Sequence, residues 1–272
     1  LDSYRLHDPC VEERDRPNRG AIAEVLSDQY FGGILGSVPG SFARRSAKYE
    51  PGYKQRALYA SDDEATIIAS HASYRFEKAM TIEGMCPLQR PKDVLKWWLA
   101  HSRTAGKEVW LSTDCSDFNK EHSLDELRIL GLAIARGWLR SISMDGGCLD
   151  KAVCSLWVAG CLGSRIVSYH DGRQERVLAA LWSGSRDAAR DSTLLHAVYH
   201  RIVCDDLSNL VHDWQRPTEV FMCGDDEDVL FSSMWEAMLY YERIKFVGWH
   251  TSDRKQLCGF HIHEFLQGIP DP

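Results

Sequence analysis

The chain has 272 residues, a formal net charge of −7, 44% hydrophobic residues and 26% charged residues. These values are typical of globular proteins and exclude a chain that is disordered or collagen-like as a whole. No apolar run approaches the roughly 18 residues of a transmembrane helix, so we expect no membrane partner. The net acidity at first argues against a nucleic-acid-binding protein, because phosphates attract cationic surfaces.

The cysteines and the start of the chain bear on the cellular compartment. The nine cysteines are scattered and odd in number, and no two form a C-x-x-C pair. This pattern argues against zinc-ribbon and thioredoxin sites and predicts reduced thiols. The chain begins at Leu1 without a signal-peptide pattern.

The first half of the chain predicts loops, helices and one buried strand. Helical periodicity is weak over 21–30, and the glycine-rich stretch 32–41 is typical of a loop. Helices are expected over 61–80 and 92–102, followed by a short buried strand over 109–111. A further helix is expected after Ser123, because Ser123 and Glu126 form a capping-box pattern in which each side chain binds a free backbone N–H.

The second half predicts two hairpins and two helices. Asp171-Gly172 separates apolar runs at 166–169 and 176–178, which predicts a hairpin turn. Apolar residues at helical spacing cover 187–204, and another helix is expected over 233–244. Strands are expected at 220–223 and 229–231, joined by a turn at 224–226. Single strands that alternate with helices indicate an α+β or α/β core.

Asp225 and Asp226 are candidate catalytic residues because a glycine turn between two apolar strands presents both. Clustered carboxylates raise each other's pKa unless a cation neutralises them. All-oxygen ligands suit Mg²⁺. Asp114 also ends an apolar strand, and if the two strands are neighbours, Asp114 and Asp225 should face each other across about 5 Å. Two metal ions shared between them would support in-line phosphoryl transfer.

Positive and negative charge are concentrated in different segments. Residues 44–56 hold five cations against the single acid Glu50, and they are candidate ligands for a nucleoside triphosphate, although an exposed charged strand is the alternative. We expect bound Mg²⁺ to offset most of the charge of six carboxylates: Asp114, Asp117, Asp225, Asp226, Glu227 and Asp228. The pairs His196/His200 and His261/His263 have the spacing of metal ligands, but we interpret both as structural because neither has a third ligand nearby in sequence.

Taken in order, these segments resemble the motif series of viral RNA-dependent RNA polymerases. The motifs are Lys48-x-Glu50-x-Gly52-x-Lys54-x-Arg56, Asp114-x-x-Asp117-Phe118-Asn119-x-x-His122-Ser123, Ser183-Gly184-x-Arg186, Gly224-Asp225-Asp226, Lys255 and Glu264-Phe265-Leu266. The second is most similar to totivirus- and chrysovirus-like double-stranded RNA viruses. The resemblance covers about residues 44–267, nearly the whole chain.

The resemblance implies an α+β right-hand polymerase core, with an antiparallel palm sheet flanked by helices and the thumb largely absent. It places partial fingers at 1–105, with the triphosphate-binding segment at 44–56. The palm would comprise 106–143 and 182–257, interrupted by a fingers insertion with a hairpin at 144–181, and 258–272 would begin the primer grip and thumb. We expect the chain to be the core of a larger polymerase.

The resemblance also implies roles for individual residues. Asp114 and Asp225 would bind two Mg²⁺ or Mn²⁺ ions, with Asp226 and the carbonyl of Cys115 assisting. Lys255 would be the general acid that protonates pyrophosphate. Nucleotide binding would involve Lys48, Lys54, Arg56, Asp117, Asn119, Ser183, Gly184 and Ser192. RNA or primer contacts would come from Arg186, Glu264 and Phe265.

One departure concerns the choice of ribose. After Ser183-Gly184-x-Arg186, relatives usually carry threonines and then an asparagine that reaches the ribose 2′-OH; here the matching positions are Ala188, Ala189 and Ser192. Serine forms fewer hydrogen bonds than an amide. Either Ser192 serves alone, or Thr193 or Asp191 compensates in a shifted register.

The expected activity is template-directed RNA synthesis from nucleoside triphosphates, for replication or transcription of a viral RNA genome. The expected partners are template and nascent RNA, nucleoside triphosphates and a capsid protein, and the expected location is the host cytoplasm, in association with the virion. The alternatives are a catalytically silent palm that binds RNA or capsid, and a reverse transcriptase. The latter usually carries an aromatic-x-Asp-Asp turn instead of Gly224-Asp225-Asp226.

Overall fold

The computed structural model describes residues 27–50, 54–74, 76, 80–87, 91–116, 118–141, 147–251 and 256–260. The elements in chain order are α2 (Asp28–Gly36), β1 (Ser41–Glu50), β2 (Lys54–Ser61), α3 (Asp63–Ala72), β3 (Cys86–Pro87), α5 (Pro91–Thr104), β4 (Val109–Asp114), α6 (Phe118–Glu121), α7 (Leu124–Arg140), α8 (Gly147–Cys161), the 3₁₀ turn η3 (Leu162–Ser164), β5 (Arg165–Ser168), β6 (Gln174–Arg176), α9 (Ala188–Leu210), β7 (Glu219–Cys223), β8 (Asp226–Phe231), α10 (Met234–Phe246) and β9 (Leu257–Gly259). None of the described helices is both long and apolar enough to cross a membrane.

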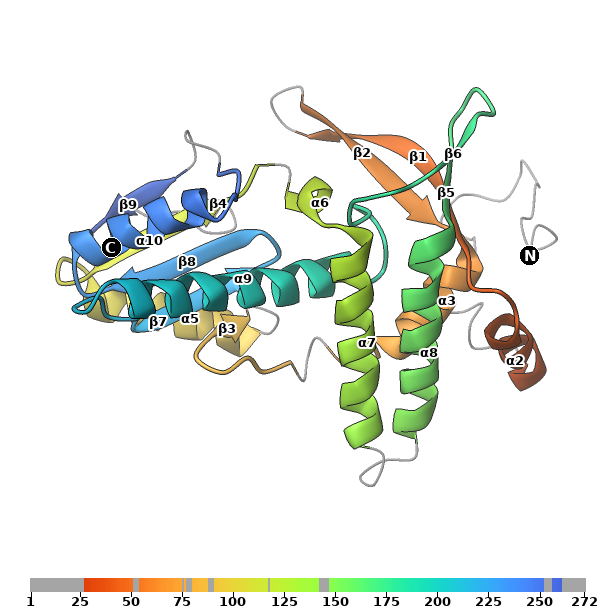
Figure 1. Cartoon of the computed structure of the whole chain (residues 1–272), viewed down its shortest axis with the longest axis horizontal. Coiled ribbons are helices and arrows are strands. Elements are labelled where there is room, and N and C mark those ends of the chain that lie inside the picture. Colours follow the sequence, from red (N-terminus) through yellow and green to blue (C-terminus); the bar gives the residue numbers. More distant parts are fainter. Residues whose placement is uncertain are drawn as a thin grey trace.

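A five-stranded sheet with the order β3-β7-β8-β4-β9 forms one half of the molecule (Figure 1). Its pairs are antiparallel except for the short parallel pair of β3 and β7. Helices cover both faces, which is why β4 is apolar on both sides. Val109 and Leu111 pack against α9 and α10, whereas Trp110 packs with Trp97 of α5 on the opposite face.

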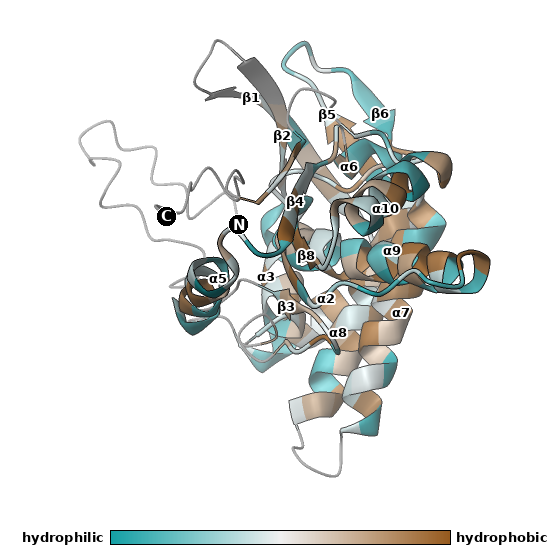
Figure 2. Ribbon diagram, turned by 90° about the vertical axis from the view of Figure 1, so that its left-hand side faces the viewer, coloured by the Kyte–Doolittle hydropathy of each residue, from teal (hydrophilic) through white to brown (hydrophobic). Residues whose placement is uncertain are grey.

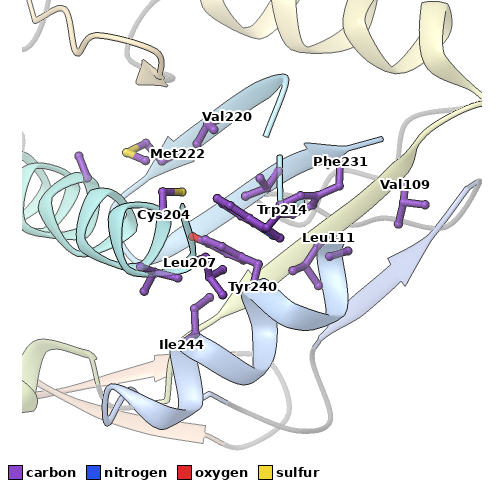
Figure 3. Packing of buried hydrophobic residues seen from close by; sticks show 14 residues of the cluster. Val109, Leu111, Cys204, Leu207, Trp214, Val220, Met222, Phe231, Tyr240 and Ile244 are labelled. Carbon is purple, nitrogen blue, oxygen red and sulfur yellow. The ribbon is translucent and has the colours of Figure 1, made fainter. Parts of the chain in front are cut away.

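The larger core cluster lies between this sheet and helices α9 and α10. Figure 3 shows Tyr240, Trp214 and Leu111 packed between the ribbon of α10 and the strands. Tyr240 and Val229 are completely buried. Burial of an apolar side chain of this size stabilises the fold by about 1.5–3 kcal/mol, so the cluster holds α9 and α10 firmly on the sheet.

A four-stranded sheet with the order β2-β1-β5-β6 forms the other half. The β1–β2 hairpin is antiparallel, and β5 runs parallel to β1. Strand β6 at the edge consists of exposed polar residues and is coloured hydrophilic in Figure 2. Such an edge resists pairing with foreign strands. On one face, Trp182 stacks on Tyr59 with ring centroids 6.2 Å apart.

Helices α7 and α8 run side by side as an antiparallel pair below the four-stranded sheet (Figure 1). Their backbones approach closely at Gly131, where an added Cβ would lie 2.9 Å from the Cβ of Ala159. Helix α7 begins at the predicted capping box: Ser123 N–H donates to Glu126 at 2.7 Å, and Glu126 N–H donates to Ser123 Oγ at 3.1 Å.

Two local predictions were wrong, and one helix was missed. Of the helix expected over 61–80, Ser61 belongs to β2 and α3 ends at Ala72. The predicted loop over 32–41 is helical as far as Gly36, because Ser27 caps α2 and Ile34 is buried against α3 and α8. Helix α8 was not predicted at all. Its buried face contains Ala152, Trp157 and Cys161. The α+β class itself is confirmed, as are helices α5, α7, α9 and α10 and both hairpins.

Candidate active site

The turn between β7 and β8 presents Asp225 at the end of the five-stranded sheet. Gly224 has φ +67°, in the left-handed region that glycine adopts without strain. Strands β7 and β8 on either side of the turn are largely buried, so they hold the turn rigidly in place. Asp225 is half-buried, and Asp226 is the first residue of β8 and not part of the turn as predicted.

Asp114 lies directly opposite Asp226, because β4 and β8 pair in antiparallel register. The predicted Asp114–Asp225 pairing was therefore wrong by one residue, and Asp225 lies just outside the ladder. Opposite residues of an antiparallel pair project from the same face, with Cβ atoms about 4.5–5.5 Å apart. Asp114 and Asp226 thus share one face of the sheet beside the turn that carries Asp225.

Cys115 follows Asp114 and is buried. Burial raises the pKa of its thiol well above the ordinary value, and the negative charges of Glu227, Asp225 and Asp114 raise that pKa further. These effects disfavour the thiolate form of Cys115. The predicted donor to a cation at this residue is its backbone carbonyl.

The carboxylates at this place suit a hard cation. Among the described residues, no three His, Cys, Asp or Glu side chains are grouped so that they could hold a metal ion by themselves. Mg²⁺, however, takes one or two protein carboxylates and completes its shell with water and substrate phosphates. Asp114 and Asp226 in register, with Asp225 next in the chain, fit that requirement.

Glu227 is fully buried beneath the turn, on the face of β8 that meets α9 and α10. It accepts hydrogen bonds from Tyr240 Oη at 3.0 Å and from Thr113 Oγ1 at 3.3 Å, and His200 Nδ1 lies 2.5 Å from its Oε1. Burial alone would raise the pKa of Glu227, but the charge of His200 and the contacts of both histidines hold it well below the usual range. Glu227 is thus an internal ion-pair partner and is not available to a metal ion.

Asp228 is equally buried on the opposite face of β8. Its carboxylate accepts from Trp97 Nε1 at 2.7 Å, His101 Nε2 at 2.8 Å and Ser112 Oγ at 3.0 Å. These donors join α5, β4 and β8. The expectation that Glu227 and Asp228 belong to the charge offset by metal ions was therefore wrong.

The Ser183–Gly184 loop lies against the four-stranded sheet. Tyr59 N–H donates to the carbonyl of Ser183 at 2.8 Å. Gly184 has φ +102°, and an added Cβ would lie 3.3 Å from the Tyr59 carbonyl. The loop therefore requires glycine, and it leads past the exposed Arg186 into α9.

Helix α9 holds three candidate residues for ribose recognition and brings two of them, Ser192 and Thr193, to the turn. Ser192 is buried and donates only to the Ala189 carbonyl, at 3.2 Å, and its Oγ lies 3.6 Å from a Cβ placed on Gly224. Thr193 Oγ1 accepts from Gly224 N–H at 2.8 Å. Asp191 is paired with Arg190 at 2.7 Å. Thr193 and Asp191 are therefore already engaged within the protein.

Some of the remaining predicted site residues lie outside the residues that the structure describes. Asn119 lies in α6, and its carbonyl accepts a hydrogen bond from Leu181 N–H at 2.7 Å. This bond connects α6 to the segment that precedes Ser183. The backbones of Lys48 and Arg56 are register partners in the β1–β2 hairpin. Outside the described residues lie the side chains of Lys48, Lys54 and Arg56, and all of Asp117, Lys255, His261, His263, Glu264 and Phe265.

Sequence reasoning missed the contacts of α9 with the turn. His196 Nδ1 lies 3.2 Å from the Gly224 carbonyl, one helical turn after Thr193. Thr193, His196 and His200 stand at helical spacing i, i+3 and i+7, which places them on one face. That spacing was the available signal. The structural interpretation of the His196/His200 pair is confirmed by their contacts with Glu227.

Comparison with known proteins shows the family to which this chain belongs. Residues 36–268 match the family model described as viral RNA-directed RNA-polymerase, and the chain belongs to that family. A curated relative is the probable RNA-directed RNA polymerase of Saccharomyces cerevisiae virus L-A. It is 26% identical over 243 residues, which cover 86% of this chain and 15% of the relative. The predicted resemblance to polymerases of double-stranded RNA viruses is confirmed.

Two crystal structures of the RNA-dependent RNA polymerase of a human picorbirnavirus are similar in fold. The insertion-loop deletion mutant has a TM-score of 0.59 and 16% identity, and the match covers 83% of this chain and 43% of that one. The other structure has a TM-score of 0.57 and 15% identity, with 83% and 42% covered. The chain thus spans less than half the length of each of these proteins.

Proposed function

We propose that this chain is the catalytic core of an enzyme that synthesises RNA on an RNA template from nucleoside triphosphates. The observation that carries the proposal is the placement of Asp114 opposite Asp226 beside the Asp225 turn. Held by Asp114 and Asp225, with Asp226 and the Cys115 carbonyl assisting, two divalent ions would supply activation of the attacking 3′-hydroxyl and stabilisation of the leaving pyrophosphate oxygen.

Other residues of the chain would bind and orient the nucleotide. Lys48, Lys54 and Arg56 would hold its phosphates, as cationic donors do in phosphoryl transfer. Lys255 would protonate the departing pyrophosphate. Thr193 Oγ1 both donates and accepts within the protein, and Asp191 is paired with Arg190, whereas Ser192 Oγ only donates and can still accept a hydrogen bond. Ribose recognition would therefore fall to Ser192, and the motif series implies that Asp117 and Asn119 assist. Ser183 and Gly184 would follow the template–nucleotide pair.

In this proposal the five-stranded sheet is the palm and the four-stranded sheet belongs to the fingers. The palm would use 106–143 and 182–257, together with β3 and α5, which belong to or pack on this sheet although they lie in the predicted fingers segment 1–105. The fingers would use the rest of 1–105 and 144–181. Arg186, Glu264 and Phe265 would contact RNA, the last two in a primer grip at 258–272 that precedes the thumb. A viral capsid protein is the proposed partner, and the host cytoplasm, within the virion, is the proposed location.

Substitution of Asp225 by asparagine in the full-length polymerase tests the proposal. Wild-type protein should extend a primer on an RNA template only with Mg²⁺ or Mn²⁺, and Asp225→Asn should abolish extension while thermal unfolding stays unchanged. Asp213→Asn is the matched control, because Asp213 is an exposed aspartate in the connection between α9 and β7, outside the turn. Undiminished activity of Asp225→Asn would refute the assignment.

The same assay separates the alternatives. Wild-type protein that binds RNA but incorporates no nucleotide would favour the silent palm, for which the altered start of α9 at Ala188, Ala189 and Ser192 is the only support. Preferential incorporation of deoxyribonucleotides would favour a reverse transcriptase. The same preference produced by Ser192→Ala alone would support Ser192 as the ribose contact.

A further inference from the structure

Helix α9 binds both backbone groups of Gly224. Thr193 Oγ1 accepts from Gly224 N–H at 2.8 Å, and His196 Nδ1 lies 3.2 Å from the Gly224 carbonyl. Since a carbonyl can only accept, Nδ1 of His196 carries the hydrogen. Two side chains one helical turn apart thus fix the peptide units on both sides of the residue that precedes Asp225.

Each of these side chains is held in turn by its own surroundings. Thr193 is completely buried and donates to the Ala189 carbonyl at 2.7 Å, so a lone pair of its oxygen is left for Gly224. His196 is completely buried between the rings of Phe118 and Trp249, at 5.5 and 5.3 Å. Its Nε2 lies 3.7 Å from Glu227 Oε2. Neither side chain can reorient without disturbing the core.

The same helix begins directly after the Ser183–Gly184 loop. Helix α9 therefore joins two parts of the site. Its first turn follows the Ser183–Gly184 loop, and its side contacts the turn that carries Asp225. We propose that Thr193 and His196 are positioning residues that set the direction of the Asp225 carboxylate relative to Asp114, and so the metal geometry during catalysis. This inference rests on the proposed polymerase function.

The test uses the full-length polymerase and the variants Thr193→Val and Thr193→Ser. Valine has nearly the shape of threonine but cannot accept the Gly224 N–H, whereas serine can. We expect Thr193→Val to lower kcat about tenfold or more, the factor that corresponds to one lost buried hydrogen bond, with the KM for nucleotide nearly unchanged. The Mg²⁺ concentration for half-maximal rate should rise, and Thr193→Ser should restore both values.

Thr104 provides a matched control on the other side of the sheet. Its hydroxyl makes the same two kinds of bond: it donates to the Ala100 carbonyl at 2.9 Å and accepts from Trp110 Nε1 at 3.0 Å. Thr104→Val should lower the melting temperature by a similar amount and leave kcat and the Mg²⁺ requirement unchanged. Equal effects of both valine variants on kcat would overturn the inference.

The outcomes separate this inference from the proposed function. A wild-type protein that incorporates no nucleotide contradicts the proposed function. An active wild type whose Thr193→Val variant keeps its kcat and Mg²⁺ requirement contradicts the positioning role alone. If Thr193→Val does not fold, His196→Leu compared with His196→Asn replaces it, since asparagine can keep a donor near the Nδ1 position. Equal kcat of those two variants would likewise overturn the inference.

Discussion

Replacing Asp228 by alanine should destabilise the protein more than almost any other single change to its acidic residues. The substitution leaves three buried donors without their acceptor: Trp97 Nε1, His101 Nε2 and Ser112 Oγ. An unpaired buried donor costs about 1–3 kcal/mol, a sum of about 3–9 kcal/mol before relaxation. We expect a loss of about 3–5 kcal/mol in the free energy of unfolding, because relaxation around the substituted residue recovers part of that sum.

Urea denaturation followed by far-UV circular dichroism measures this loss and also tests its cause. Trp97→Phe removes one donor and should cost about 1.5–3 kcal/mol when Asp228 is present. The same change in the Asp228→Ala protein should cost much less, because the acceptor is already gone. The surface variant Asp213→Ala should stay within about 0.5 kcal/mol of wild type. A coupling energy below about 0.5 kcal/mol between Trp97 and Asp228 would refute the reasoning.

Two further predictions concern helix packing and pH. Gly137→Ala should stabilise α7 by about 0.5–1 kcal/mol, since nothing lies within 4 Å of the added Cβ. Gly131→Ala should be about 1–3 kcal/mol less stable than Gly137→Ala, because its Cβ would meet Ala159 at 2.9 Å; equal stability in chemical denaturation would contradict the packing argument. The native pKa of Glu227 is lowered, so its stabilising effect is present above its unfolded pKa of about 4.3 and is lost as the pH falls. Contact with Glu227 raises the pKa of His196 despite burial, so that contribution is present below the unfolded pKa and is lost as the pH rises through the raised native value. The stability difference between wild type and Glu227→Gln should therefore shrink at both ends of a pH series, and a pH-independent difference would argue against the ion pair.

Features that depend on a few neighbouring residues could be predicted from the sequence. The capping box consists of two hydrogen bonds between Ser123 and Glu126, which are three residues apart, and both bonds are present. The Asp171-Gly172 hairpin and the Gly224 turn likewise depend on local backbone preferences. The candidate metal ligands were proposed for the same reason, since Asp114 ends β4, Asp226 begins β8 and Asp225 lies in the turn just before it.

Features that depend on distant contacts could not be predicted. Strands β4 and β8 lie more than a hundred residues apart in the chain. The pairing of Asp114 with Asp226 depends on how these two strands align. Both strands are buried on both faces, and each has polar residues on both faces near the turn, so alternation of polar and apolar residues does not distinguish a shift by one position. Helix α2 forms through Gly32 and Gly33 because packing of Ile34 outweighs their poor helix propensity.

The contacts of Glu227 and Asp228 change how the net negative charge of the chain is interpreted. Glu227 and Asp228 were counted with the metal site, yet each is buried and bound to histidine on its own face of β8. Buried carboxylates cost stability unless they are paired, and both of these carboxylates are paired within the protein. Under the proposed function, bound cations would therefore have to offset mainly Asp114, Asp225 and Asp226. The same two residues join β8 to α9 and α10 on one face and to α5 on the other. Glu227 and Asp228 are part of the net negative charge that at first argued against a nucleic-acid-binding protein. Through these contacts they stabilise the turn that carries Asp225 from both faces of the sheet.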